Sequence, residues 1–103
     1  MEAMVRFVSI PEMRIYARRL VRARKKAGRT QREVAEAISC TQGFISRVED
    51  GQMMLRAADY PIVAEYLGVP IEELLGPFTE EEKAELAKAP SAPVDGFDVD
   101  EVE

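Results

Sequence analysis

The chain is short and lacks several residues on which enzymes and metal sites depend. Its 103 residues contain no histidine and one cysteine, Cys40, so we expect neither a metal site nor a disulfide framework. We also expect no cofactor and no enzymatic activity, because no histidine base, reactive cysteine setting or phosphate-binding loop is present. With no signal-peptide pattern and no apolar run of about 20 residues, a cytoplasmic protein that spans no membrane is expected.

Charge is distributed unevenly along the chain. The net charge is −5 at pH 7, but residues 1–56 carry 12 Lys and Arg against 6 acids, and residues 57–103 carry 2 against 13. Screening in ordinary salt acts within roughly 10 Å, so the two halves present separate fields to a polyanion. The basic half is therefore compatible with nucleic-acid binding despite the acidic total.

The N-terminal third predicts a short lead-in followed by a long helix. Residues 1–10 mix apolar and charged side chains and indicate either a short strand or an arm. Ser9 and Glu12, with Pro11 between them, predict a helix start, and helical spacing continues to about Ala27. The stripe expected to face the core comprises Met13, Tyr16, Ala17, Leu20, Arg24 and Ala27. A basic stripe, expected either to be a solvated face or to contact phosphates, comprises Arg14, Arg18, Arg22, Lys25 and Arg29.

Two short helices with capping residues follow across a tight turn. The first is expected over residues 30–38, because Thr30 and Glu33 form a capping box. The second is expected to begin after Thr41, whose hydroxyl can accept from a first-turn amide, and to end at Gly51. Two short helices joined by so short a turn predict a helix-turn-helix.

The second of these helices has one apolar and one polar face. Ile45 and Val48 are three positions apart and are expected to anchor it to the core. The polar face offers amide and guanidinium groups, which match base edges in the major groove. Expected base contacts come from Gln42, Gly43, Ser46 and Arg47. Phe44 either packs on the scaffold or contacts a thymine methyl. The alternative for the helix as a whole is an ordinary core helix whose polar face is solvated.

The loop that follows is unusually apolar. Met53, Met54 and Leu55 are consecutive, so we expect them to pack against their own domain or against a second copy or protein partner. The next helix ends at Leu67. Its start is open, because Pro61 must either begin it or kink it.

The C-terminal part predicts one more core helix and an acidic extension. A fifth helix is expected over residues 69–75, and its residues expected to face the core are Ile71, Leu74 and Leu75. Thr79 and Glu82 form another capping box, which predicts a helix over residues 80–88. The remaining residues, 90–103, indicate a disordered solubilising tail, a strand paired with the N-terminal segment, or a DNA mimic on the basic face.

The run from Leu20 to Gly76 resembles the XRE, or Cro-type phage repressor, helix-turn-helix domain. The matching positions are Arg24, Gly28, Thr30, Gln31, Ala35, the stretch 45–51, Ala64, Leu67, Gly68, Val69, Leu74 and Leu75. The resemblance covers about half of the chain, and its signature is specific. This chain departs from the pattern at Ser39, where the family usually has glycine, and at Arg29, where it usually has an aliphatic residue.

The resemblance implies an all-α, five-helix lambda-repressor-like domain. Its boundaries would be residues 1–10 for an arm or short strand, 11–76 for the domain and 77–103 for a short acidic C-terminal extension. Arg24 lies on the apolar stripe and needs a carboxylate to offset its desolvation. The resemblance implies that Glu49 supplies it, as a structural ion pair.

We therefore expect a sequence-specific regulator of transcription that binds double-stranded DNA. A repressor that binds a two-fold operator as a homodimer fits best, because one small module buries too little surface for tight, specific binding. Expected phosphate contacts are Gln31, Arg32, Thr41 and Arg56. The alternative is an antitoxin-like or adaptor protein whose main role is to bind a protein partner, through Met53, Met54 and Leu55 or through the acidic tail.

Overall fold

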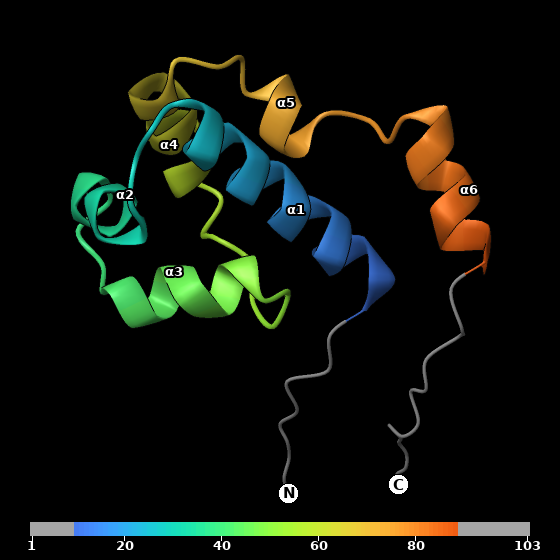
Figure 1. Ribbon diagram of the computed structural model, residues 1–103, viewed down its shortest axis with the longest axis horizontal. Helices are drawn as coiled ribbons and strands as arrows, with labels where there is room; N and C mark the ends of the chain where they lie inside the picture. Colours follow the sequence, from blue (N-terminus) through green and yellow to red (C-terminus); the bar gives the residue numbers. More distant parts are fainter. Residues whose placement is uncertain (1–9, 89–103) are drawn as a thin grey trace, which may run out of the picture.

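The structure is a computed structural model that describes residues 10–88, and within this range it contains helices and no strand (Figure 1). The helices are α1 (Pro11–Lys26), α2 (Gln31–Ala37), α3 (Gln42–Glu49), α4 (Asp59–Leu67), α5 (Glu72–Leu75) and α6 (Glu80–Lys88). The expected all-α helix-turn-helix fold is confirmed by α1 to α5, and α6 lies in the acidic extension. The predictions for residues 1–9 and 89–103, an arm or strand and a tail, lie outside the described residues.

The core is built mainly from residues of the first five helices. α1 packs against α3 and α5, while α2 packs against α3 and α4. Each of these five helices contributes a large side chain that is at most 1% exposed: Ile15, Val34, Ile45, Val63 and Leu74. Complete burial of such a side chain stabilises a fold by about 1.5–3 kcal/mol. The packing of these buried side chains therefore helps to fix the positions of α2 and α3 relative to α1.

The buried face of α1 is wider than the sequence pattern indicated. Ala17 and Leu20 are buried as expected, but Ala27 is exposed and Met13 is only half-buried. The additional buried residues are Ile15, Arg19 and Ala23. The face is wide because α1 is covered by α3 on one side and by α5 and α6 on the other.

The start of α1 lies where the sequence predicts it. Pro11 occupies the first helical position, and the N-cap is Ile10, which makes no side-chain cap hydrogen bond. The predicted helix start is therefore confirmed, and Ser9 lies outside the described residues. Proline is suited to begin a helix without such a cap, because its φ is already helical and its missing N–H would have no partner there.

The two helices of the helix-turn-helix begin as their capping residues predict. In α2 the Glu33 amide donates to the Thr30 hydroxyl at 3.1 Å, and the Glu33 carboxylate accepts from the Thr30 amide at 2.9 Å. In α3 the Phe44 amide donates to the Thr41 hydroxyl at 3.1 Å. The turn between them passes through Ser39 with φ of 57°, a left-handed conformation that serine adopts at a cost of roughly 1–2 kcal/mol.

The apolar loop after α3 packs against its own domain. Leu55 is 5% exposed and belongs to the core, and Met53 and Met54 are half-buried against it. The Tyr60 hydroxyl donates to the Met54 sulfur at 3.8 Å. Of the alternatives expected for this loop, packing against its own domain is therefore the one that the structure shows for Leu55, whose side chain is buried in the core.

The beginning of α4 and the end of α5 complete the domain. α4 begins at Asp59, so Pro61 neither opens nor kinks it but lies in the first turn, where its missing N–H needs no partner. α5 is shorter than expected and buries Leu74, whereas Leu75 is 37% exposed. The inward orientation expected for Leu75 is therefore wrong, because one turn of helix has only one inward position here.

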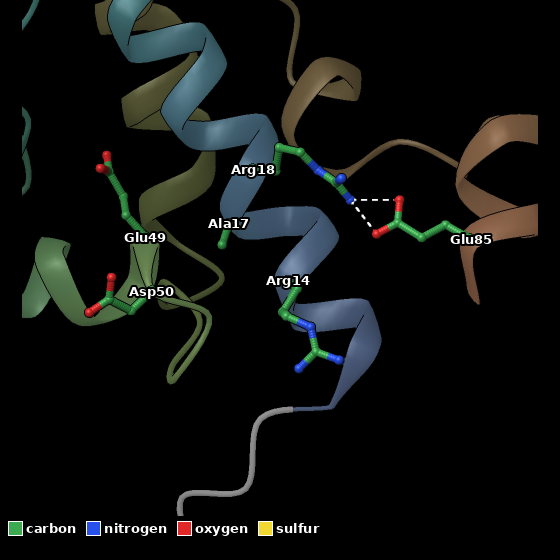
Figure 2. A pocket seen from close by; sticks show the side chains of 6 residues that line it. All are labelled: Arg14, Ala17, Arg18, Glu49, Asp50 and Glu85. Atoms are coloured by element: carbon green, nitrogen blue, oxygen red, sulfur yellow. Dashed lines mark hydrogen bonds and ion pairs between the residues drawn. The ribbon is translucent and has the colours of Figure 1, made fainter. Parts of the chain in front are cut away.

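Helix α6 is attached to α1 by hydrogen bonds from two arginines of α1 and not by a buried apolar face. It has no buried residue, and its amino terminus carries the expected capping box of Thr79 and Glu82. Arg19 of α1 donates to the Glu82 carboxylate at 2.7 and 3.2 Å. One turn further along α6, Glu85 accepts at both carboxylate oxygens from Arg18, at 2.8 and 2.9 Å (Figure 2). The acidic extension is thus part of the folded unit up to the end of α6.

Arg19 is the residue on which this attachment depends. It is 6% exposed, and it also donates to the carbonyl oxygens of Gly76 and Pro77 at 2.8 and 2.9 Å. Its guanidinium lies 5.8 Å from the Tyr16 ring and 5.5 Å from the Phe78 ring, close enough for cation–π attraction. The hydrogen bonds from Arg19 hold the pKa of Glu82 at about 2, well below its ordinary value of 4.5.

This lowered pKa predicts an acid-dependent loss of stability. Because the folded protein lowers the pKa of Glu82, the stabilisation is complete above pH 4.5 and is lost as the pH falls towards 2. Glu82→Gln should reduce the free energy of unfolding at neutral pH by about 1.5–3 kcal/mol, the value of a hydrogen bond to a charged group. Urea unfolding of both proteins at a series of pH values measures this, and the difference should shrink in acid.

The neighbouring Glu81→Gln variant is a matched control, because Glu81 is exposed and makes no hydrogen bond or ion pair within residues 10–88. It should unfold like the unmodified protein at every pH. Equal pH profiles for the Glu82→Gln variant and the unmodified protein would show that the Arg19–Glu82 contact contributes nothing to stability.

Candidate nucleic-acid interface

Helix α3 has the two faces that the sequence indicates. Ile45 and Val48 are buried, and Phe44 is half-buried against the core, which favours packing over a thymine contact. The four expected base-contacting side chains lie on the other side. Gln42, Gly43 and Arg47 are exposed and Ser46 is half-buried. A Cβ built on Gly43 would lie 3.8 Å from an Arg47 guanidinium nitrogen, so that side chain folds back along the helix surface.

Arg24 and Glu49 meet as expected and form the base of this surface. Arg24 Nε donates to Glu49 Oε2 at 2.6 Å, and Arg24 Nη2 donates to Oε1 at 2.9 Å. Both side chains are largely buried, at 11% and 5% exposure. The hydrogen bond to Glu49 is the main cause that raises the pKa of Arg24 above its ordinary value. The pair links the middle of the fold to the last turn of α3.

A chain of hydrogen bonds extends from this pair to the tip of α3. Gln31 Nε2 donates to Glu49 Oε1 at 2.9 Å, and Gln42 Nε2 donates to Gln31 Oε1 at 3.3 Å. Gln31 therefore braces Gln42, the first residue of α3. Gln42 keeps its Oε1 and one N–H, the two groups with which an amide can bind adenine. Gln31 likewise keeps one N–H for a further acceptor.

A polar groove lies beside this chain at the amino terminus of α2. It is lined by Arg24, Arg29, Thr30, Gln31, Arg32 and Gln42. The expected phosphate-contacting residues Gln31 and Arg32 thus share one groove, together with Arg29 of the basic stripe. Arg29 is held by the Tyr66 ring, 5.0 Å from its guanidinium, and by Glu33 at 4.0 Å. Three arginines make this groove suitable for an anion.

The other two expected phosphate contacts lie outside this groove. Thr41 uses its hydroxyl as the cap of α3. Arg56 lies beyond the loop after α3, and its guanidinium binds the Asp59 carboxylate at 2.7 and 3.1 Å while remaining 63% exposed. The burial of Asp59 and its pairing with Arg56 carry no signal in the sequence beyond a spacing of three residues.

A second cleft opens between α1, the end of α3 and α6 (Figure 2). It is lined by Arg14, Ala17, Arg18, Glu49, Asp50 and Glu85. Arg18 is bound to Glu85 on one wall, whereas Arg14 makes no ion pair or hydrogen bond within residues 10–88. The expected basic stripe of α1 is indeed exposed, but α6 neutralises one of its members.

Cys40 has the surroundings of a structural residue. It is half-buried against the core, and its thiol donates to the Thr41 carbonyl at 3.6 Å. Burial is the main cause that raises the pKa of the thiol above its ordinary value. A raised pKa disfavours the reactive thiolate, which supports the packing role that its position suggests.

This geometry is that of a helix-turn-helix protein. Residues 15–75 match the family model described as "Helix-turn-helix domain", so the chain belongs to this family. The predicted membership of a helix-turn-helix DNA-binding family is confirmed. Membership supports the assignment of the protein to the DNA-binding regulators of transcription.

One solved structure shows the same fold over most of the chain. It is a hypothetical transcription factor, NHTF, from Neisseria, with 23% sequence identity and a TM-score of 0.57. The match covers 72% of this chain and 83% of that one. Among curated proteins no match was found. None of the described helices is long and apolar enough to cross a membrane.

The Arg24–Glu49 pair should behave as one unit in folding. Removing either partner leaves a charge largely buried without its counterpart, which costs about 3 kcal/mol or more. Arg24→Ala and Glu49→Ala should therefore each lower the free energy of unfolding, and the double variant should cost less than the sum. Chemical unfolding of the four proteins in a double-mutant cycle measures the coupling. Additive losses would mean that the two side chains do not stabilise one another.

Proposed function

We propose that this protein is a transcriptional repressor that binds a two-fold operator in double-stranded DNA as a homodimer. The observation that carries the proposal is the braced polar face of α3, where Gln42 is held by Gln31, which is held by the Arg24–Glu49 pair. A side chain that is held before binding loses less entropy when it meets a base. Preorganised amide and guanidinium groups on an exposed helix suit the major groove.

Each part of the surface has a proposed role. Base contacts come from Gln42, Gly43, Ser46 and Arg47, which share the exposed side of α3. Phosphate contacts come from Gln31, Arg32, Thr41 and Arg56. Arg32 and Arg47 make no ion pair within residues 10–88, so their charges are available to an anion. Homodimerisation is part of the proposal because a single module of this size buries too little surface for tight specific binding.

The apolar loop does not support the alternative of a protein whose main role is to bind a protein partner. Leu55 lies in the core and Met53 and Met54 are half-buried against it, so the loop offers no contiguous apolar patch of three residues. For the acidic tail, which lies beyond the described residues, we propose that it lowers non-specific binding to DNA through repulsion or through contact with the basic face.

Base readout by Arg47 and Gln42 predicts loss of specificity on truncation. An arginine that grips guanine or a glutamine that grips adenine is worth about 1–3 kcal/mol of discrimination. Arg47→Ala should therefore reduce the ratio of specific to non-specific affinity more than it reduces non-specific affinity. Selection of bound fragments from a random DNA pool, followed by titration of the selected site and a scrambled duplex, measures both. Unchanged preferences for both Arg47→Ala and Gln42→Ala would contradict the proposal.

Gln31 and Arg32 should differ in a way that follows from their contacts. Arg32→Gln should weaken all sequences alike and reduce the slope of log affinity against log salt by about 0.9, because one phosphate contact is lost. Gln31→Ala should weaken all sequences and also relax preference at the base pair met by Gln42, because the brace at 3.3 Å is removed. Salt titrations of two duplexes that differ at this base pair measure both effects. A Gln31→Ala variant with unaltered affinity for both duplexes would exclude the phosphate contact.

A further inference from the structure

The guanidinium of Arg56 is fixed by hydrogen bonds within the protein. Nε donates to Oδ2 of Asp59 at 2.7 Å, and Nη2 donates to Oδ1 of the same carboxylate at 3.1 Å. Nη2 also donates to the carbonyl oxygen of Ile38 at 3.1 Å. A planar guanidinium bound along one edge by a carboxylate has a defined orientation, unlike a free surface arginine.

The two partners are very differently exposed. The Asp59 side chain is 6% exposed, and its Oδ2 also accepts from the Arg56 backbone amide at 3.3 Å. The Arg56 side chain is 63% exposed, and Nη1 makes no hydrogen bond within residues 10–88. Because Nε and Nη2 form the edge that faces Asp59, Nη1 lies on the opposite side of the guanidinium, where solvent has access.

The carbonyl of Ile38 places this arginine at the turn of the helix-turn-helix. Ile38 is the C-cap of α2, and the next residue, Ser39, takes the left-handed conformation that redirects the chain towards α3. The hydrogen bond from Arg56 therefore connects the loop before α4 to the place where α2 ends. A group that binds to Nη1 would lie beside the turn that leads into the exposed helix α3.

We propose that Asp59 is a positioning residue, which fixes Arg56 so that Nη1 binds a DNA phosphate beside the turn between α2 and α3. The inference rests on the proposed function and adds a positioning residue to that interface. A phosphate takes hydrogen bonds well from a guanidinium edge, and Asp59, being buried, would not itself touch it.

If Asp59 acted only through its charge, its removal would have the opposite effect on DNA affinity from that expected for a positioning residue. The direction of the change in affinity therefore tests the proposal. Removing an acid near a polyanion should tighten binding if only the field matters. Removing the residue that orders Arg56 should instead weaken it, by about two- to twelve-fold for one long side chain that must be ordered on binding. The two effects are distinguishable without knowledge of the operator, because phosphate contacts are independent of sequence.

The experiment measures the affinity of the full chain for a fluorescently labelled DNA duplex of mixed sequence over a series of salt concentrations. The variants are Asp59→Asn, Arg56→Gln, the double variant and Arg56→Lys, and thermal melting shows which are folded at the assay temperature. Asp50→Asn is the matched control, because Asp50 is an exposed acid at the end of α3 with no ion pair within residues 10–88. It should bind as tightly as the unmodified protein or more tightly.

Weaker binding by Asp59→Asn, with no further weakening when it is added to Arg56→Gln, supports the proposal. Arg56→Gln should also reduce the salt slope by about 0.9. Binding by Asp59→Asn that is unchanged or tightened, as in Asp50→Asn, overturns it, and so does an equal weakening in the Arg56→Gln background. If Asp59→Asn does not fold, the Arg56→Lys variant decides. A lysine keeps the charge but has no planar edge that Asp59 could fix. Affinity equal to that of the unmodified protein then overturns the proposal, and lower affinity supports it. Failure of the unmodified protein to bind any duplex would contradict the proposed function itself.

Discussion

The carboxylate of Glu49 is the point at which the three helices of the interface are joined. Its Oε2 accepts from Arg24 of α1, and its Oε1 accepts from both Arg24 and Gln31 of α2, while Glu49 itself ends α3. At 5% exposure this anion would be costly without its partners. The buried charge of Glu49 is stabilised only when α1 and α2 place Arg24 and Gln31 beside it. In turn, these hydrogen bonds specify the position of α3 in addition to packing.

This constraint reaches the exposed surface through amides. Gln31 connects Glu49 to Gln42, because its side-chain nitrogen donates to Glu49 and its side-chain oxygen accepts from Gln42. A buried ion pair therefore controls the orientation of an exposed side chain at the other end of α3. A methionine at position 31, of similar length, would fill the same space but would leave Gln42 free to rotate. The specificity proposed for the interface thus depends on a residue that need not touch a base.

The sequence was most informative where a feature is local. The capping boxes at Thr30 and Thr79 and the cap at Thr41 each involve residues within three positions, and all appear in the structure. The family resemblance added one distant contact, Arg24 with Glu49. Arg19 was missed because its partners lie 57 to 63 positions away, so that no local pattern distinguishes it from the exposed arginines on either side. The sites of base and phosphate contact remain predictions.

The division of charge along the chain has a structural explanation. Acids of the second half hold arginines of the first: Glu82 binds Arg19, Glu85 binds Arg18 and Asp59 binds Arg56. The first two pairs lie where α6 meets α1, and the third lies beside the turn between α2 and α3. Arg32 and Arg47, by contrast, make no ion pair within residues 10–88. The acidic half therefore does more than repel a polyanion. It neutralises two arginines where α6 meets α1 and orients a third, Arg56, that faces solvent. It leaves the cations near α2 and α3 uncompensated. A net charge of −5 is consequently a poor guide to the field at that surface, where Arg24, Arg29 and Arg32 line one groove.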